Sequence, residues 1–506
     1  MQKPPKVATC TMAQDMSLRR NWDRGDGREQ WRLGGTTKGV SAIMKRQISI
    51  LILLLSIALS PSSVAAQGVL GGLLSNVGSS LSSLTSPQPG VIVRTNLGLG
   101  GLKVVCLLHG CTVVGNLDGN LNQVFLVRPV QGLLPNLLAN VLNLVTGILD
   151  AEPDQVLQIP PDPTSQQTSN APPAGLWDTT PVNYYGTTVT DGYVNQPAAQ
   201  IIQISQAQNG FNVSGAGIVA DIDTGVDPNH PAFQGVLLQG YDFTRNQPGG
   251  SEMNDVSMSA PPPCNSCEPA YVNQHTAAML DQHTAHMLDG TSYEAFGHGT
   301  MVMGVIHLVA PTAKLLPLKA FSANGNGSLS NIIAAIYFAV QNNANVINMS
   351  FDMTQGSTEL TDAINYANSQ NVILVASSGN DGANEMVYPA GLQNVMGVAS
   401  TNNQDQRSSF SNYGNQIVWV AAPGEGIVTT YPFGIYAAGW GTSFSSPFVS
   451  GTASLILNMQ PKANQKQAAW AISHAKFVGL NMGNGRLNVD WTLSSLNPVQ
   501  GLLQLQ

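Results

Sequence analysis

Four short apolar runs alternate with helical patterns between residues 215 and 380, and this alternation constrains the fold more than any other feature. The runs are GAGIVADIDTG, AKLLPLKAF, NVINMSF and NVILVASSGN. The segments SLSNIIAAIYFAVQNN and ELTDAINYANSQ, which lie between the later runs, have the apolar spacing of helices. Buried strands that alternate with helices form a parallel sheet. We therefore predict an α/β domain over residues 176–495, with a parallel sheet flanked by helices.

A β-α-β-β-α-β pattern precedes this sheet. Residues 91–158 begin with the strand VIVRT, close with the strand DQVLQI, and include a hairpin with Asp118-Gly119 at its turn. This order predicts a small ferredoxin-like α+β domain. The residues that follow are rich in Pro, Ser and Gln, so we interpret 159–175 as a linker. Residues 496–506 are interpreted as a tail.

The segment 44–66 has the pattern of a secretory signal peptide. Lys45 and Arg46 precede an apolar run, and the small residues Val64-Ala65-Ala66 fit a cleavage site. The run is shorter than the roughly 20 residues that a membrane-spanning helix needs. We interpret 1–43 as an upstream extension that is not genuine, and 67–90 as a Gly/Ser-rich spacer. The expected protein is secreted or in the cell envelope, without a membrane anchor once the signal is removed.

The charge of the remaining chain is strongly acidic. From Gln67 onward there are 11 basic and 25 acidic residues, which gives a net charge of −14. Nucleic-acid binding needs a basic surface, so this charge argues against it.

Two close cysteine pairs and one histidine-rich repeat invite other interpretations. Cys106 and Cys111, and likewise Cys264 and Cys267, could form disulfides in an exported protein or remain free thiols. No second half of a zinc site follows the C-x-x-C pair. The repeat QHTAAMLD-QHTAHMLD at 274–289 could be a metal cluster, but we favour an amphipathic helical insert.

Three short motifs contain the residues of a nucleophilic triad. Asp223 follows a buried run, His298 stands between glycines at an expected helix start, and Ser443 stands at another in GTSFSSP. A serine hydroxyl is a poor nucleophile unless a base takes its proton, and that base needs a carboxylate to hold its tautomer. The order Asp, His, Ser along the chain is that of subtilisin, the standard example of this arrangement.

The chain resembles the subtilisin-like serine protease family (subtilases, peptidase S8) over roughly residues 200–495. The motifs that carry the resemblance are Asp223-Thr224-Gly225, His298-Gly299-Thr300 and Gly441-Thr442-Ser443. The segment VASSGNDG resembles the oxyanion segment of the family, which implies Asn380 as a donor together with the Ser443 backbone N–H. The resemblance implies a serine endopeptidase that works through an acyl-enzyme and needs no cofactor for its chemistry.

Several alternatives to this assignment exist within the sequence. Ser445 and Ser446 are rivals for the nucleophile, and Asp221 is a rival for Asp223. The family pattern selects Ser443, which directly follows Gly-Thr, and Asp223, which precedes Thr-Gly. A non-enzymatic exported binding protein on the same scaffold is the alternative function, and an esterase is a third.

The substrate-binding segments are inferred from the resemblance. FSANGNGSLS resembles the segment that pairs with peptide backbone, and NMSFDM resembles the opposite wall of the cleft; the residues concerned are Gly325, Asn326, Gly327, Ser350, Phe351 and Asp352. Peptide held between them would form an added strand. The chain departs from the family at Asp352-Met353, which replaces Gly-Gly, at Val387 near the primary pocket, and at Met301, which replaces a second His. Asp352 either attracts basic substrate residues or points to solvent and caps a turn.

The 91–158 domain resembles the inhibitory propeptide of the family. DAEPDQVLQI is similar to its closing strand, with Ala151-Glu152-Pro153-Asp154 at a turn. The resemblance implies an autoprocessed zymogen whose propeptide assists folding and occupies the cleft until it is cleaved. Calcium stabilises many family members, but no acidic loop here is specific enough to assign a metal. The expected partners are peptide or protein substrates, and the expected state is a monomer.

Overall fold

The computed structural model describes residues 89–159, 173–256, 270–271 and 295–496. The interpretations of the signal peptide, the spacer, most of the linker, Cys264 and Cys267, the histidine repeat and the C-terminal tail lie outside the described residues. Among the described helices, none is both long and apolar enough to cross a membrane.

The segment from Val91 to Pro153 is a four-stranded antiparallel sheet with two helices, as predicted. Its elements in order are β1 (Val91–Thr95), α3 (Gly98–His109), β2 (Cys111–Asn116), η1 (Gly119–Leu121), β3 (Val124–Pro129), α4 (Pro135–Leu142) and β4 (Ile148–Pro153). The strand order β2-β3-β1-β4 is that of a ferredoxin-like unit. Cys106 and Cys111 form a disulfide between α3 and β2, which decides between the two possibilities left by the sequence.

The prediction that DQVLQI closes this sheet is wrong. The closing strand is β4, so Ala151, Glu152 and Pro153 lie in a strand and not at a turn. Only Ala151 of that strand is fully buried, so the strand lacks a clear apolar pattern. It also ends in a Pro, which is tolerated at the end of an edge strand but is common in turns. The apolar residues that follow form β5 (Val156–Gln158), which pairs instead with β13 (Asn326–Ser328).

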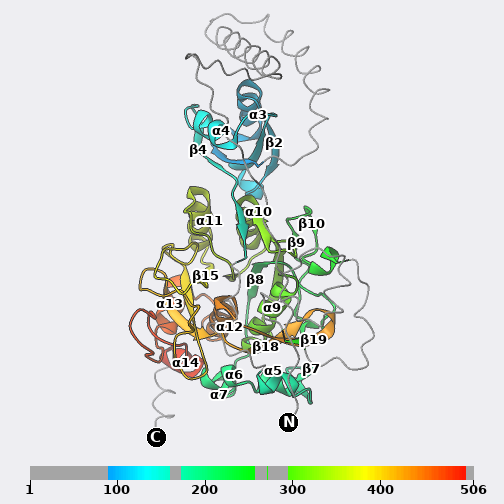
Figure 1. The fold of residues 1–506 in the computed structure, drawn as a ribbon, viewed down its shortest axis with the longest axis vertical. Helices are drawn as coiled ribbons and strands as arrows, with labels where there is room; N and C mark the ends of the chain where they lie inside the picture. The colour runs from blue at the N-terminus through cyan, green and yellow to red at the C-terminus, as the bar shows by residue number, and fades with distance from the viewer. Residues whose placement is uncertain (1–88, 160–172, 257–269, 272–294, 497–506) are drawn as a thin grey trace, which may run out of the picture. The chain divides into compact units, whose positions relative to one another are not determined.

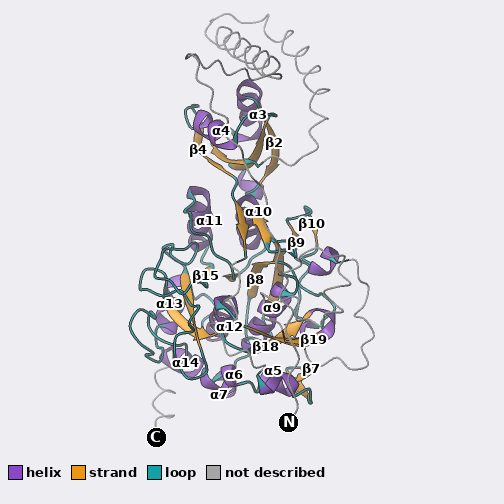
Figure 2. Ribbon diagram, in the orientation of Figure 1, coloured by secondary structure: helices purple, strands orange, loops and turns teal. Residues whose placement is uncertain are grey.

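The larger domain is built on an eight-stranded, mostly parallel sheet, which confirms the predicted α/β fold (Figures 1 and 2). In spatial order its strands are β10 (Gln247–Pro248), β9 (Tyr241–Asp242), β12 (Lys314–Lys319), β8 (Ile218–Asp223), β14 (Val346–Met349), β15 (Ile373–Ser377), β16 (Met396–Thr401) and β17 (Val420–Pro423). The four predicted strands are the adjacent β12, β8, β14 and β15. Only the β9–β10 pairing is antiparallel.

Helices cover both faces of this sheet. Successive strand residues alternate between two cores: Val346 packs with α9 (His298–Val309) and α12 (Thr442–Met459), and Ile347 packs with α10 (Leu329–Gln341) and α11 (Thr358–Ser369). This alternation explains why the strands are continuous apolar runs, since both faces are buried. The remaining elements are η2 (Ala174–Trp177), β6 (Pro181–Tyr184), β7 (Thr187–Thr190), α5 (Asp191–Val194), α6 (Pro197–Ile201), α7 (Ile204–Phe211), η3 (Pro231–Phe233), η4 (Glu252–Asp255), β11 (Ala270–Tyr271), β18 (Ile427–Tyr431), η6 (Pro432–Gly434), β19 (Ile435–Gly439), α13 (Gln465–Ile472) and α14 (Val489–Leu496).

The close packing of α9 on β18 at Gly304 generates a stability prediction. A Cβ at Gly304 would lie 2.1 Å from Thr430 Oγ1 and 2.3 Å from Thr429 Oγ1. Both hydroxyls already donate to α9 carbonyls and cannot turn away freely. We expect Gly304→Ala to lower the free energy of unfolding by about 1–3 kcal/mol through overpacking, measured by urea unfolding of the full chain.

The matched control is Gly100→Ala in α3, where no other atom lies within 4 Å of a Cβ. There the same substitution should raise stability by about 0.5–1 kcal/mol, because alanine loses less backbone entropy in a helix. Equal effects at the two positions would contradict the packing account.

Candidate active site

Asp223 and His298 form a buried hydrogen-bonded pair at the carboxyl end of β8. Asp223 is the last residue of β8 and His298 is the first of α9. His298 Nδ1 lies 2.6 Å from Oδ1 and 2.8 Å from Oδ2 of Asp223. The two residues are 2% and 1% exposed. A carboxylate facing Nδ1 keeps the proton on that nitrogen, so Nε2 is left as the basic nitrogen, and it has no partner in the structure.

Ser443 stands at the start of α12, on the same side of the sheet. Its Oγ donates to the Ser350 carbonyl at 3.2 Å, and it forms no hydrogen bond to His298. The Asp–His link of a triad is therefore formed in this structure, and the His–Ser link is not. Hydrogen bonds between catalytic groups often tighten only when substrate is bound, so the hydroxyl's present direction does not argue against a triad.

The Asn380 side chain is held with its amide nitrogen free. Its Oδ1 accepts from the backbone N–H and the hydroxyl of Thr442, both at 2.9 Å. These two donors fix which end of the amide faces Thr442, so Nδ2 points elsewhere and has no partner although it is buried. An unpaired donor next to Ser443 has the chemistry of an oxyanion-hole group.

The rival serines have other hydrogen-bond partners. Ser445 Oγ donates to the Pro423 carbonyl at 3.1 Å, and Ser446 Oγ lies 3.0 Å from Ser350 Oγ. All three serines of the segment are buried, so burial does not separate Ser443 from its rivals.

The rival carboxylate, Asp221, forms no hydrogen bond to His298. Its Oδ1 accepts from Asn348 Nδ2 at 2.9 Å, and its Oδ2 has no partner. Burial, and then the negative charge of Asp223, raise the pKa of Asp221 well above its usual range. Asp223, unlike Asp221, forms a hydrogen bond to His298 in this structure.

Residues 215–490 match the family model described as the subtilase family. The chain belongs to the subtilase family. It is 32% identical over 305 residues to thermitase of Thermoactinomyces vulgaris, covering 58% of this chain and 94% of thermitase. It is 34% identical over 275 residues to a thermophilic serine proteinase of Bacillus sp. (strain AK1), covering 53% of this chain and 60% of that protein. Among solved structures, a cold adapted subtilisin-like serine proteinase is 28% identical, with 55% of this chain and 90% of that chain covered and a TM-score of 0.45.

One expected substrate segment of this subtilase is already paired with its own chain. Strand β13 pairs antiparallel with β5, so that Asn326 lies opposite Gln158 and Gly327 opposite Leu157. The Ile159 N–H donates to the Gly325 carbonyl at 2.9 Å. The backbone of segment 325–327 therefore already pairs with an added strand, which is the mode of binding expected for a peptide.

Residues 350–352, expected to form the opposite wall of the substrate cleft, lie partly in the hydrophobic core. Phe351 is buried with its ring 5.2 Å from that of Phe321, so its side chain packs in the domain. Ser350 and Ser443 form two hydrogen bonds. The Ser350 carbonyl accepts from Ser443 Oγ, and Ser350 Oγ donates to the Ser443 carbonyl at 3.0 Å. Val387 and Met301 are fully buried, which makes them packing residues in this subtilase.

Asp352 is half-buried, and its Oδ2 occupies the space beside Gly379, 2.5 Å from where a Cβ would be. Burial, and then the negative charges of Asp381 and Glu385, raise the pKa of Asp352 to about 7. Because Gly379 directly precedes Asn380, this carboxyl group lies close to the expected oxyanion site.

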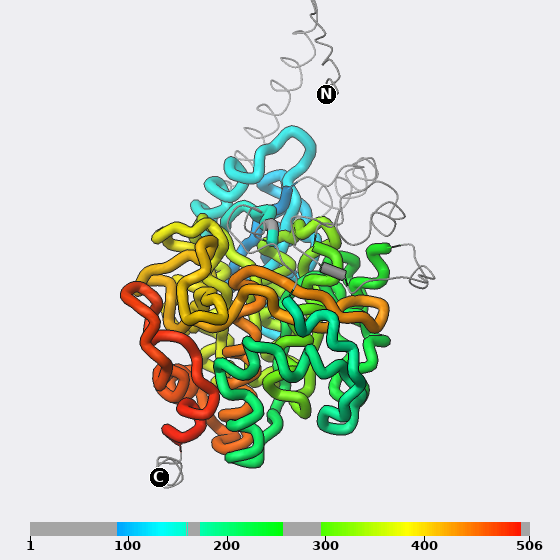
Figure 3. Tube along the Cα trace, turned by 60° about the horizontal axis from the view of Figure 1, so that its bottom comes forward, coloured from blue at the N-terminus to red at the C-terminus, as the bar shows by residue number. Residues whose placement is uncertain are grey.

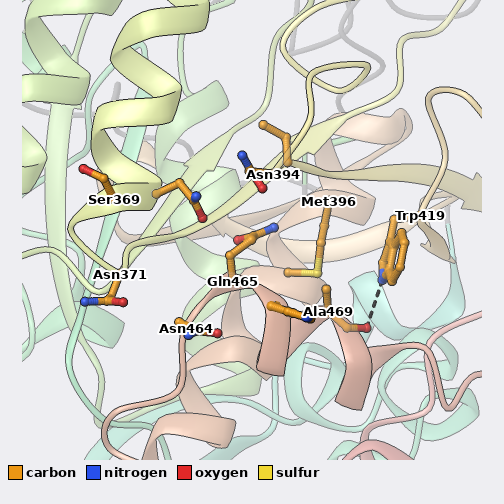
Figure 4. Close-up of a pocket in the computed structure, with 11 residues that line it drawn as sticks. Ser369, Asn371, Asn394, Met396, Trp419, Asn464, Gln465 and Ala469 are labelled. Carbon is orange, nitrogen blue, oxygen red and sulfur yellow. Dashed lines mark hydrogen bonds between the residues drawn. The ribbon is translucent and has the colours of Figure 1, made fainter.

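A separate cavity of about 560 Å³ lies at the amino ends of β15 and β16 (Figure 4). Its polar groups have structural partners or roles. Gln465 pairs with the backbone of Leu374, and Trp419 Nε1 donates to the Ala469 carbonyl at 3.0 Å. Asn371 and Asn394 have left-handed backbones at φ 64° and 71°, which favour Asn. We assign no ligand to this cavity.

Among the described residues, no group of three or more His, Cys, Asp and Glu is suited to hold a metal ion.

Two substitutions separate the rival carboxylates. Asp223→Asn should lower kcat for a peptide substrate by about 10⁴-fold, because the amide no longer holds the His298 tautomer. Asp221→Asn should change kcat less than about threefold, because Asp221 forms no hydrogen bond to His298 and an amide is close to a carboxyl group in shape. The measurement is steady-state hydrolysis of a chromogenic peptide. A larger loss in Asp221→Asn than in Asp223→Asn would reverse the assignment.

Proposed function

We propose that the protein is a secreted serine endopeptidase, made as a zymogen, in which Ser443 is the nucleophile, His298 the general base and Asp223 its partner. The hydrogen bonds between Asp223 and His298 Nδ1 carry the proposal, because they leave Nε2 as an unpaired base. Membership of the subtilase family supports the reaction class. The signal-like segment 44–66 supports secretion.

The reaction begins when substrate binds and Ser443 Oγ turns toward His298. His298 Nε2 takes the hydroxyl proton while Oγ forms a bond to the scissile carbonyl carbon, and the carbonyl electron pair moves to its oxygen. Asp223 stabilises the imidazolium. His298 then gives the proton to the leaving nitrogen as the C–N bond breaks, which leaves the acyl-enzyme. Water, activated by His298, attacks the ester carbon and releases the acid and Ser443.

The negative oxygen of the tetrahedral intermediate is held by two donors in this scheme. They are Asn380 Nδ2, which is unpaired and oriented by Thr442, and the Ser443 backbone N–H. Loss of such a side-chain donor typically costs about 10²–10³ in kcat. The positive end of the α12 helix dipole also favours negative charge there.

The ferredoxin-like unit acts as an intramolecular inhibitor in this proposal. Two carboxylates of this unit, whose chain is coloured blue to cyan in Figure 3, accept hydrogen bonds at helix starts of the larger domain. Asp154 accepts from the N–H and hydroxyl of Ser330 in α10, at 2.9 and 2.7 Å. Glu152 accepts from Ser357 Oγ and from the first N–H groups of α11. These bonds satisfy helix N–H groups that have no partner within the helix.

The strand β5 leads from this unit into the cleft. Its pairing with β13 occupies the edge that we assign to substrate, and Leu157 and Ile159 are buried against the larger domain. The Pro-rich residues that follow support cleavage between about 155 and 180. We expect substrate to pair with the same edge, from Gly325 to Gly327, after the unit is removed.

Self-processing tests the proposal most directly. Wild-type protein should be shortened during expression in a strain lacking other proteases, whereas Ser443→Ala should keep its precursor length because no acyl-enzyme can form. Ser443→Ala and His298→Ala should each lower caseinolysis at least about 10⁴-fold without unfolding. Ser445→Ala is the matched control and should process. Normal processing or caseinolysis by Ser443→Ala would overturn the assignment of Ser443 as the nucleophile, whereas a wild-type protein without caseinolysis would favour the binding protein.

The Asp352 carboxyl group predicts a pH-dependent preference at the cut site. Its pKa of about 7 means that it gains negative charge as the pH rises from 6 to 8, so attraction to a substrate Arg should grow over that range. We expect the ratio of kcat/KM for Arg over Phe to rise about tenfold in wild type. In the isosteric variant Asp352→Asn the ratio should stay flat. Any effect of pH that is common to both substrates cancels in the ratio. If the ratio in wild type does not change with pH, Asp352 plays no part in the choice between Arg and Phe substrates.

A further inference from the structure

Two buried ions of opposite charge hold Thr224, the residue that follows Asp223. Glu252, at the start of η4, accepts a hydrogen bond from Thr224 Oγ1 at 2.9 Å. Lys319, the last residue of β12, donates to the Thr224 carbonyl at 2.7 Å. Both side chains are fully buried. No motif in the sequence marks either residue.

The same Glu252 carboxylate also holds the start of the helix that carries His298. Its Oε2 accepts from the Gly297 N–H at 2.8 Å, and its Oε1 accepts from the N–H of Thr300 at 3.2 Å and from the Thr300 hydroxyl. One carboxylate therefore bonds both to the residue after Asp223 and to the residue before His298.

The segment that carries Glu252 is itself fixed to the Asp223 loop. The Val226 N–H donates to the Gly250 carbonyl at 2.9 Å, and the Glu252 N–H donates to the Val226 carbonyl at 3.1 Å. Gly225 has φ 105°, and a Cβ there would lie 2.6 Å from the Gly250 carbonyl oxygen. The carboxylate thus reaches the Asp223–His298 pair from a backbone that has little freedom to move.

The charge of Glu252 depends on these contacts. Burial raises the pKa of Glu252 to about 7, while the hydrogen bonds from Thr300 and Gly297 and the charge of Lys319 lower it. Lys319 in turn pairs with Asp255 at 2.7 Å. A buried ion at this position is costly unless its partners are complete, which argues that the contacts act together.

We propose that Glu252 is a positioning residue for catalysis, which sets the separation and alignment of Asp223 and His298 by bonding to Thr224, Gly297 and Thr300. The inference rests on the proposed function of the triad. Glu252 contacts neither Ser443 nor the substrate edge in the described structure, so its effect acts through the Asp–His pair. A misplacement of about 1 Å in such a pair costs on the order of 10²-fold in rate.

The first test is Glu252→Gln, which keeps the shape of the side chain. The amide NH₂ must face either Gly297 or Thr300, whose backbone N–H groups cannot turn away, so hydrogen bonds on one side are lost. In the processed enzyme we expect kcat for a chromogenic peptide to fall about 10- to 100-fold, with KM changed less than twofold. Loss of binding with kcat unchanged would overturn the positioning role.

A spectroscopic readout separates positioning from general destabilisation. In the full-length Ser443→Ala protein, the Nδ1–H proton of His298 reports its hydrogen bond to Asp223 as a far-downfield resonance. Glu252→Gln should shift or broaden this resonance. The control is Asp405→Asn, which removes ion pairs of 2.6 Å to Lys476 and 2.7 Å to Arg486 away from the site, and should leave both the resonance and kcat unchanged.

A second pair of variants keeps the test decisive if Glu252→Gln folds poorly. Thr224→Val removes the hydroxyl between Glu252 and the Gly299 N–H and should lower kcat, whereas Thr224→Ser retains that hydroxyl and should lose much less. Wild-type kcat and resonance in both Glu252→Gln and Thr224→Val would overturn the proposal. The resonance is measured without turnover, so an inactive wild-type protein would refute the proposed function while leaving the positioning role testable.

Discussion

The hydrogen bond between Asp223 and His298 is the interaction on which the rest of the site depends. It exists because β8 ends and α9 begins at the same edge of a parallel sheet, and because the sheet is buried on both faces. Burial excludes water from the pair, which strengthens the hydrogen bond and makes any unpaired charge beside it costly. The surrounding carboxyl groups illustrate this cost: burial raises the pKa of Asp221, and both carboxylate oxygens of Glu252 accept hydrogen bonds.

The sequence predicted the parts of the fold in which local pattern and burial agree. The runs around Ile218 and Ile373 are apolar on both faces because each face meets helices, so their strands and the α/β class were predictable. The strand Ile148–Pro153 was missed because it is an edge strand with mostly half-buried side chains, two acidic residues and a Pro at its end. The apolar residues after it, 156–159, are apolar because they pack on the larger domain and not because they close the small sheet.

Some residues of the candidate site were likewise predictable from the sequence, and others were not. Short motifs identified Asp223, His298 and Asn380, and the structure brings Asp223 and His298 into contact and leaves the Asn380 amide unpaired. The direction of the Ser443 hydroxyl was not predictable, since it depends on the Ser350 carbonyl from another strand end. Glu252 and Lys319 were not predictable either, because a buried ion gains its role from partners more than 25 residues away, and no spacing rule relates them.

The pairing of β5 with β13 has a thermodynamic consequence for a tethered inhibitor. While the chain is continuous, residues 156–158 meet the cleft at an effective concentration fixed by a short connection, on the order of millimolar for flexible linkers. A single cut in the following segment turns this into an ordinary bimolecular equilibrium. In the proposed zymogen, occupancy of the cleft would then depend on protein concentration, so dilution after export would act as the release step without any change in the contacts themselves.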